Sequence, residues 1–203
     1  MTHNRGAPLE FELLLWKDGF TRIAGIDEAG RGAWAGPVSA AAVILPPNPH
    51  LTRTLSCVRD SKQMTPLERE TWAPRIQEAA LAWGVGFASA EEIDSIGILP
   101  ATKLAAIRAF EQLSPDYLLT DYLIFPEFDL PQTGLIKGDQ RSLSIAAASV
   151  LAKTARDARM RTFDEEYPGY GFARHKGYGT RIHQEALCRL GRCAIHRKSF
   201  AIP

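Results

Sequence analysis

The stretch of residues 22–45, RIAGIDEAGRGAWAGPVSAAAVIL, decides the fold of this 203-residue chain. Residues 22–27 are mainly apolar or β-branched and lead into a glycine-rich segment, which predicts a short strand. Residues 36–45 form a second apolar run that stops at Pro46 and Pro47, which predicts another strand. We expect the two strands to lie side by side in one sheet.

Helical and strand-like segments alternate after this pair. Residues 64–81 predict a helix with Thr65 as its N-cap, and Pro74 is expected to end or kink it. Ser89 and Glu92 form a capping box ahead of a short helix. The other expected elements are strands at 82–88, 117–120 and 135–136, and helices at 98–113, 142–163 and 181–190. This order predicts an α/β fold with a mixed central sheet flanked by helices and a C-terminal helical segment.

Length and composition favour one domain in a reducing compartment. We expect a body at residues 1–170, with a basic loop and helical segment at residues 171–203 packed on it. The best apolar stretch, residues 37–45, has half the length needed to cross a membrane, and the N-terminus lacks the features of a signal peptide. Three cysteines without CxxC spacing argue against disulfides and structural zinc. A cytoplasmic protein without membrane association is expected.

The formal net charge of +1 is unevenly distributed. Residues 174–203 contain seven Arg or Lys and one acid, Glu185, so this segment carries +6 and the first 173 residues carry −5. Such a distribution suits a protein that binds a polyanion at one end and divalent cations at the other. A solvated basic tail would show the same charge.

Asp27 and Glu28 stand at the end of the first predicted strand, ahead of the turn Gly30-Arg31-Gly32. Adjacent strand residues point to opposite faces, so the two carboxylates can share a site only if the strand ends or bulges there. Mg²⁺ and Mn²⁺ bind carboxylate oxygens, and a glycine backbone can approach a ligand closely. A surface acid pair before an ordinary turn is the alternative. A dinucleotide-binding fingerprint is disfavoured because a strand follows the glycines.

Two further acids end short apolar runs, Asp121 after residues 117–120 and Asp139 after residues 135–138. An α/β fold can assemble a metal site from acids at the ends of separate strands. Asp157 lies four residues after Lys153, so an ion pair within a helix explains it equally well. The pattern alone does not exclude the other acids, Asp60, Asp116, Glu127, Asp129 and Asp157.

Residues 169–180, GYGFARHKGYGT, mix basic, aromatic and glycine residues. This mixture suits nucleic acid, because Arg and Lys bind phosphates while an aromatic ring stacks on a base or sugar. A glycine-rich loop with core aromatics is the alternative. His175, His183 and His196 lack metal-ligand spacing and are expected to be phosphate contacts or packed side chains.

Five separated blocks together resemble the bacterial ribonuclease HII family, in order, from about residue 20 to residue 200. They are GIDEAGRGAWAGPVSAAAVIL, the DSK of residues 60–62, KGDQRSLSIAAASVLAKTARD, GYGFARHKGYGTRIHQEAL and the closing HRKSF. The resemblance implies an RNase H-like fold and a divalent-metal endonuclease. It is less close to ribonuclease HIII, the sister family, which has a different residue in place of Arg31 and an added N-terminal domain.

The resemblance also implies roles for individual residues. The catalytic acids and ligands of two Mg²⁺ or Mn²⁺ ions would be Asp27, Glu28, Asp121 and Asp139. The turn Gly30-Arg31-Gly32 would sense the ribose 2′-OH, and Tyr178 would stack on a sugar. Other expected substrate contacts are Ser61, Lys62, Lys153, Arg174, Lys176 and Arg181. The residues that depart from those usual in the family are Trp34, Tyr122, Gln140 and Arg141.

The expected reaction is hydrolysis of the phosphodiester 5′ to a ribonucleotide, leaving a 3′-hydroxyl and a 5′-phosphate. The expected partners are RNA/DNA hybrids and DNA duplexes that contain ribonucleotides, and a monomer suffices for the chemistry. Another RNase H-like nuclease is an alternative that would ignore a single ribonucleotide. A non-catalytic nucleic-acid-binding module is a second alternative, but it has no need of four acids at strand ends.

Overall fold

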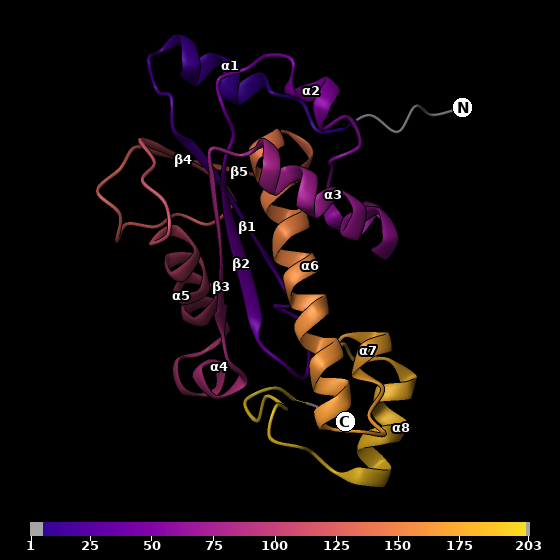
Figure 1. The fold of residues 1–203 in the computed structure, drawn as a ribbon. Helices are drawn as coiled ribbons and strands as arrows, with labels where there is room; N and C mark the ends of the chain where they lie inside the picture. Colours follow the sequence, from indigo (N-terminus) through magenta and orange to yellow (C-terminus); the bar gives the residue numbers. More distant parts are fainter. Residues whose placement is uncertain (1–5, 202–203) are drawn as a thin grey trace.

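The computed structural model describes residues 6–201, and a five-stranded sheet forms its centre (Figure 1). The strand order is β3-β2-β1-β4-β5. The pairs β1–β2 and β2–β3 are antiparallel, whereas β1–β4 and β4–β5 are parallel. The strand bounds are β1 Ile23–Ala29, β2 Val38–Ile44, β3 Ala82–Ala88, β4 Tyr117–Asp121 and β5 Gln132–Leu135. The sheet is therefore mixed, and the first two predicted strands are neighbours, as expected.

Helices cover both faces of this sheet (Figure 1). α3 and α6 lie on one face, α4 and α5 on the other, and α7 and α8 pack at the far end of α6. The helix bounds are α1 Glu10–Lys17, α2 Leu51–Thr54, α3 Pro66–Ala79, α4 Ala90–Ile96, α5 Ile98–Phe110, α6 Leu143–Glu166, α7 Phe172–His175 and α8 Arg181–Leu190, with 3₁₀ turns η1 Ser61–Gln63 and η2 Gly138–Gln140. Among residues 6–201, no helix is long and apolar enough to cross a membrane.

The two faces of β2 supply two hydrophobic cores. Ala41 and Val43 pack in the core on the side of α3 and α6, whereas Ala40 and Ala42 pack in the core that includes α5. Because successive strand residues point to opposite faces, one fully buried strand serves both layers.

Gly25 lets β1 approach α6 closely. A Cβ at this position would lie 2.2 Å from the backbone carbonyl carbon of Ser144, which is far inside van der Waals contact. The first turns of α6 are rich in alanine and serine, so the helix itself also presents little bulk to the sheet. This close packing holds the N-terminal part of α6 directly behind the edge where β1 and β4 end.

The structure departs from the predicted elements at several points. α3 continues through Pro74, although proline cannot donate to the carbonyl four residues earlier, so of the two expected effects, an end or a kink, the end does not occur. β5 ends at Leu135, which leaves the exposed Ile136 outside the strand. α1 was not predicted, and its position depends on the buried Glu12, which accepts hydrogen bonds from Ser142 Oγ at 2.6 Å and from the backbone N–H of Ser144 at 2.8 Å.

Candidate active site

Three acidic residues meet where the parallel ladder between β1 and β4 ends. Its last pair is Ile26 with Thr120, whereas β1 stays paired with β2 as far as Ala29. The pairing of β1 with β2 thus continues after its pairing with β4 has ended, and β1 does not stop at Asp27 as predicted. The next residues along the chain are Asp27 and Glu28 on β1 and Asp121 on β4, and all three line one small cavity.

Asp139 is brought to the same edge by the turn that follows β5. Lys137 has a left-handed backbone conformation, with φ 56°, and reverses the chain into η2. The backbone N–H of Gly138 then donates a 2.7 Å hydrogen bond to Oδ1 of Asp121. The Asp139 side chain is buried, and it lies close enough to Asp60 for that carboxyl to raise its pKa. The fourth predicted acid therefore lies beside the third.

Burial and mutual repulsion disfavour negative charge on these acids. Burial raises the pKa of Asp27 well above its usual value, and Glu28 and Asp121 raise it further. Burial also raises the pKa of Glu28, against the opposing effect of Arg31, whose guanidinium lies 3.0 Å from Glu28 Oε1. The pKa of Asp139 rises to about 6 because of burial and the nearby Asp60 and Asp121. The cluster is thus short of positive charge.

Lys62 supplies part of that positive charge. Burial opposes the charge on its ammonium group, but Asp27, Asp60, Asp139 and Glu28 outweigh this effect and raise the Lys62 pKa. Asp60 also caps η1 by accepting a 2.9 Å hydrogen bond from the backbone N–H of Lys62. Sequence reasoning named Asp60 only as a rival acid, because its proximity to Asp139 arises from the fold.

The donor set fits a hard divalent cation. Mg²⁺ and Mn²⁺ bind carboxylate oxygens, and a cation would relieve the repulsion that raises these pKa values. Within residues 6–201, no group of three or more His, Cys, Asp or Glu side chains is close enough together to form a ready-made metal site. Asp121 instead accepts a hydrogen bond from Gly138, and Asp139 lies beside Asp60.

An open cavity of about 560 Å³ adjoins the acids. It joins the turn after β1 to η1, to the middle of α6 and to the loop between α7 and α8. Its lining includes many of the substrate contacts expected from the sequence: Gly30, Arg31, Gly32, Ser61, Lys62, Lys153 and Tyr178. Glu28 lines both this cavity and the small acidic one, so the two adjoin at that side chain.

Lys153 and Tyr178 lie together on one wall of this cavity. The Lys153 ammonium is 5.4 Å from the centre of the Tyr178 ring and 2.7 Å from Asp157 Oδ1. Asp157 is also bound by Arg69, at 3.0 Å, and Arg69 donates to the backbone carbonyl of Ser61 at 2.9 Å. The expected ion pair between Lys153 and Asp157 is present, and Asp157 links α6 to the segment that carries Ser61.

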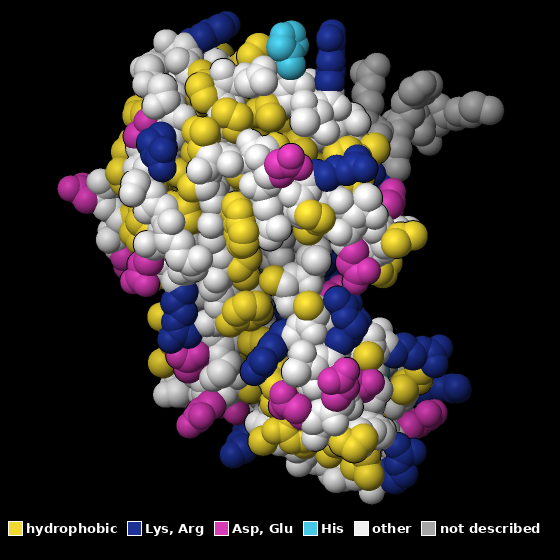
Figure 2. All heavy atoms as spheres, viewed as in Figure 1, with side chains coloured by type: hydrophobic (Ala, Val, Ile, Leu, Met, Phe, Trp, Pro, Cys, Tyr) yellow, Lys and Arg dark blue, Asp and Glu magenta, His cyan; other side chains and the backbone are white. Residues whose placement is uncertain are grey.

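Three expected substrate contacts lie outside the lining of this cavity. Arg174 is exposed on α7, Arg181 pairs with Glu185 on α8, and Lys176 Nζ donates to the carbonyl of Ala173. In Figure 2 the outline has a notch between the upper body and the lower end that carries α7 and α8, and Lys and Arg side chains are scattered around that end. None of the three lines the cavity, although Lys176 lies near enough to Asp157 and Lys153 for their charges to affect its pKa.

The three histidines of the C-terminal part are packed side chains. His183 Nδ1 lies 3.0 Å from the carbonyl of Tyr178, and its Nε2 lies 3.0 Å from His196 Nε2. His175 stacks on His183 with ring centres 4.4 Å apart. Of the two expectations, packing holds and phosphate contact does not, because all three rings are buried.

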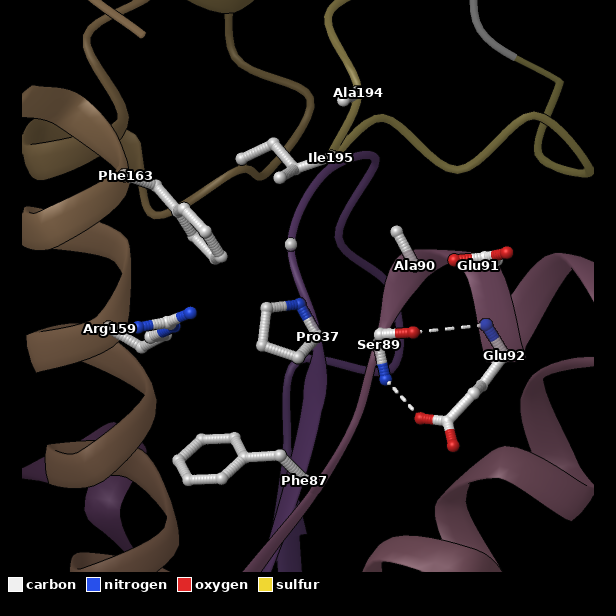
Figure 3. A pocket seen from close by; sticks show the side chains of 11 residues that line it. Pro37, Phe87, Ser89, Ala90, Glu91, Glu92, Arg159, Phe163, Ala194 and Ile195 are labelled. Carbon is white, nitrogen blue, oxygen red and sulfur yellow. Dashed lines mark hydrogen bonds between the residues drawn. The ribbon is translucent and has the colours of Figure 1, made fainter. Parts of the chain in front are cut away.

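A second cavity, of about 540 Å³, lies on another part of the molecule (Figure 3). Pro37, Phe87, Phe163 and Ile195 supply apolar walls, and Arg159 reaches in from α6. The polar groups of Ser89 and Glu92 in its wall bond to one another across the start of α4. This cavity contains none of the site residues expected from the sequence.

Two buried arginines behind the 30–32 turn were missed by sequence reasoning. Arg197 donates to the backbone carbonyls of Gly30 and Arg31, and Arg156 donates to those of Ala35 and Pro37. The motif HRKSF contains Arg197, but no local pattern shows that it binds a turn at the other end of the chain.

The mixed five-stranded sheet with helices on both faces and acids at one edge is an α/β fold of the RNase H-like class. The structure is similar to that of the RNase HII in a PCNA:RNase HII complex from Archaeoglobus fulgidus, with a TM-score of 0.73 and 26% identity, over 87% of this chain and 92% of that chain. The fold is also similar to that of Bst-RNase HIII in complex with Mn²⁺, with a TM-score of 0.66 and 20% identity, over 89% of this chain and 67% of that chain.

Sequence comparison identifies the family. The family described as Ribonuclease HII matches residues 24–202. The Ribonuclease HII of Syntrophotalea carbinolica is 52% identical over 196 residues, which is 96% of this chain and 92% of that protein. The chain therefore belongs to the ribonuclease HII family.

Proposed function

We propose that this protein is an endoribonuclease that hydrolyses the phosphodiester 5′ to a ribonucleotide, both in RNA/DNA hybrids and at single ribonucleotides embedded in duplex DNA. The observation that carries the proposal is the pair of adjoining cavities. Glu28 lines both, so the acidic cluster lies next to the surface formed by the 30–32 turn, Lys62, Lys153 and Tyr178. A polyanion seated on that surface would place one phosphodiester beside the acids.

Asp27, Glu28, Asp121 and Asp139 would hold Mg²⁺ or Mn²⁺. Such ions, when bound, activate a water molecule and stabilise the departing 3′-oxygen. The protein itself buries the carboxylates and holds them close together, which favours the binding of a cation. Arg31 would keep Glu28 oriented through their ion pair, and Lys62 would balance charge on the opposite side.

Recognition of the ribonucleotide is assigned to the 30–32 turn and to Tyr178. The 2′-OH is the group that distinguishes RNA from DNA. Gly32 has no heavy atom within 4 Å of the position of a Cβ, so the turn leaves open space beside its backbone. The Tyr178 ring is half-buried beside Lys153, which allows one ring face to stack on a sugar while the ammonium binds a phosphate.

We further propose that residues 171–203 act as a substrate-facing segment on a catalytic body formed by residues 1–170. Arg174, Lys176 and Arg181 would then contribute through their long-range attraction for phosphates. A cytoplasmic location and a monomeric state complete the proposal.

The test uses an end-labelled DNA duplex that carries one ribonucleotide, incubated with Mg²⁺ or Mn²⁺ and, separately, with EDTA. Cleavage at the 5′ side of the ribonucleotide is expected only with metal, and ligation assays should find a 3′-hydroxyl and a 5′-phosphate. Cleavage of RNA tracts without cleavage at a single ribonucleotide would indicate another RNase H-like nuclease. Metal-independent binding without any cleavage would indicate a binding module.

A matched pair of variants controls for the assignment of the acids. Asp27→Asn is expected to lower kcat by at least about 10³, because it removes one cation ligand from a buried cluster. Asp129→Asn changes an exposed acid in the loop before β5 and should leave kcat unchanged. Rapid cleavage by the Asp27 variant would contradict the proposed site.

A further inference from the structure

Two arginines lie completely buried behind the 30–32 turn. Arg156 and Arg197 are both 0% exposed, and neither forms an ion pair in the part of the chain that the structure describes. Buried charges are normally paired with a carboxylate, because an uncompensated charge away from water is costly. Here burial and the nearby Arg156 lower the Arg197 pKa to about 9, so their placement has a real electrostatic cost.

All hydrogen bonds of the Arg197 guanidinium in the described residues go to backbone carbonyls of the loop after β1. Its Nη2 donates to the carbonyl of Gly30 and its Nη1 to the carbonyl of Arg31, both at 2.7 Å. Its Nε donates to the carbonyl of Gly36 at 3.0 Å, and its backbone N–H donates to Trp34 at 2.9 Å. The loop therefore folds around one guanidinium group, whose rigid fork supplies several donors at once.

These contacts fix the direction of two amide groups. In a trans peptide the C=O and the N–H of the same peptide unit point in opposite directions, and the described chain contains no cis peptide bond. Because the carbonyls of Gly30 and Arg31 point inward to Arg197, the N–H groups of Arg31 and Gly32 point away from it. Both residues are exposed and line the large cavity, and their N–H groups donate to no acceptor among residues 6–201.

Arg156 holds the neighbouring backbone in the same way. It donates to the carbonyls of Pro37 at 2.8 Å, Ala35 at 3.1 Å and Lys176 at 2.9 Å, and its guanidinium lies 5.4 Å from the Tyr178 ring. A Cβ on Gly30 would lie 1.9 Å from Arg156 Nε, so a glycine is required for this approach. The arginines thus tie the 30–37 loop to the segment that carries Tyr178.

We propose that Arg197 is a positioning residue for ribonucleotide selection. By holding the carbonyls of Gly30 and Arg31 inward, it aims the N–H groups of Arg31 and Gly32 at the sugar and phosphate of the bound ribonucleotide. This inference rests on the proposed function and deepens it, because it assigns the selectivity for ribose to a side chain that does not itself touch the substrate. A purely structural Arg197 would support stability and affect ribose and deoxyribose alike.

The test compares affinities in EDTA, where no turnover occurs, for a duplex with one ribonucleotide and for the same duplex as all-DNA. The variant Arg197→Lys keeps the charge but replaces the fork with a single ammonium group. Its ribose preference, the Kd for all-DNA divided by the Kd for the ribonucleotide duplex, should fall about tenfold, while the Kd for all-DNA changes less than about twofold. An unchanged preference, or an equal loss of affinity for both duplexes, would overturn the proposal.

Arg189→Lys is the matched control. Arg189 also donates to a backbone carbonyl, that of Gly169 at 2.8 Å, but it lies on α8 outside the lining of the large cavity. Its ribose preference should equal that of the unaltered protein. If the unaltered protein itself fails to cleave ribonucleotide duplexes, the proposed function fails; if it cleaves them and Arg197→Lys keeps the preference, only the role of Arg197 fails.

A second measurement needs no variant, and so remains decisive if Arg197→Lys does not fold. In NMR spectra of the ¹⁵N-labelled full chain, the amide protons of Arg31 and Gly32 should shift more on binding the ribonucleotide duplex than on binding all-DNA. The amide of Gly191, at the end of α8, should respond equally to both duplexes. Equal responses at Arg31 and Gly32 would contradict the proposal.

Discussion

The backbone N–H of Gly138 donates to Oδ1 of Asp121, and this 2.7 Å hydrogen bond joins the end of β4 to the turn that carries Asp139. One carboxylate thereby orients the backbone that delivers the next. Burial, together with the neighbouring carboxylates, raises the pKa values of Asp27 and Asp139, so charging this cluster has a cost. A site of this kind lowers the free energy of unfolding of the metal-free protein and favours the binding of cations.

The first prediction concerns the effect of these charges on stability and on cation binding. Asp139→Asn removes one of the repelling charges, so the metal-free protein should gain about 1 kcal/mol in free energy of unfolding at pH 7.5. The same variant should lose cleavage activity and most of the rise in melting temperature that Mn²⁺ gives the unaltered protein. Thermal unfolding in EDTA and in Mn²⁺ checks both parts. A loss of stability in EDTA would show that Asp139 has a structural role instead.

The second prediction concerns Tyr178. Tyr178→Ala should lower kcat/KM at a single embedded ribonucleotide more than within a long RNA tract, because the lost stacking matters most where one sugar positions the substrate. Tyr178→Phe keeps the ring and should retain most of the activity on both substrates. Parallel kinetics on the two substrates provide the check, and equal losses for Tyr178→Ala would contradict the stacking role.

The third prediction separates packing from function among the glycines. Gly25→Ala should destabilise the protein by about 3 kcal/mol, because its Cβ would meet the backbone of Ser144 at 2.2 Å and neither strand nor helix can easily move. Gly32→Ala meets no atom within 4 Å and should leave the stability unchanged. Urea unfolding of both variants tests this, and similar midpoints would refute the close approach of β1 to α6.

The fourth prediction follows from the buried histidines. His183 Nδ1–H donates to the Tyr178 carbonyl, so its Nε2 must accept from the Nε2–H of His196. Burial lowers the His183 pKa from 6.5 to about 4. Between those values the unfolded chain binds a proton that the folded chain excludes, so this contribution to stability is complete above pH 6.5 and is lost as the pH falls toward 4.

Urea unfolding at pH 7.5, 6 and 5 measures this effect. His183→Gln should flatten the decline in the free energy of unfolding with falling pH, whatever its stability at neutral pH. His50→Gln, at an exposed histidine, should decline as the unaltered protein does. A variant at His183 that keeps the full slope would show that the decline arises elsewhere.

The fold was predictable where the signals are local. The capping boxes at Thr65–Glu68 and Ser89–Glu92 are both present and begin α3 and α4. The apolar runs of β1 and β2 pair as expected, since a buried strand needs only a continuous apolar stretch and punctuation by glycine and proline. The helix α1 could not be predicted, because the anchor of Glu12 is a pair of groups at the start of α6.

The acidic residues of the candidate site were predictable from the sequence, but the residues that hold them and the adjacent loop in place were not. The acids at the ends of apolar runs converge because parallel strands end at a common edge. The partners of Asp60, Arg156 and Arg197 are distant in sequence and, for the two arginines, are backbone carbonyls that leave no pattern. Tyr122 is similar: its φ of 68° lies in the left-handed region that favours glycine, and only the structure reveals that conformation.

Helix α6 positions many of the side chains that form and support the site. Within about two turns of α6, Ser149 bonds to Ser61 at 2.8 Å, Lys153 lines the cavity, and Arg156 and Asp157 hold distant segments. An α-helix turns by about 100° per residue. Inserting or deleting one residue here would rotate every later side chain by about 100° around the helix axis. The interval from Ser149 to Asp157 must therefore keep its number of residues.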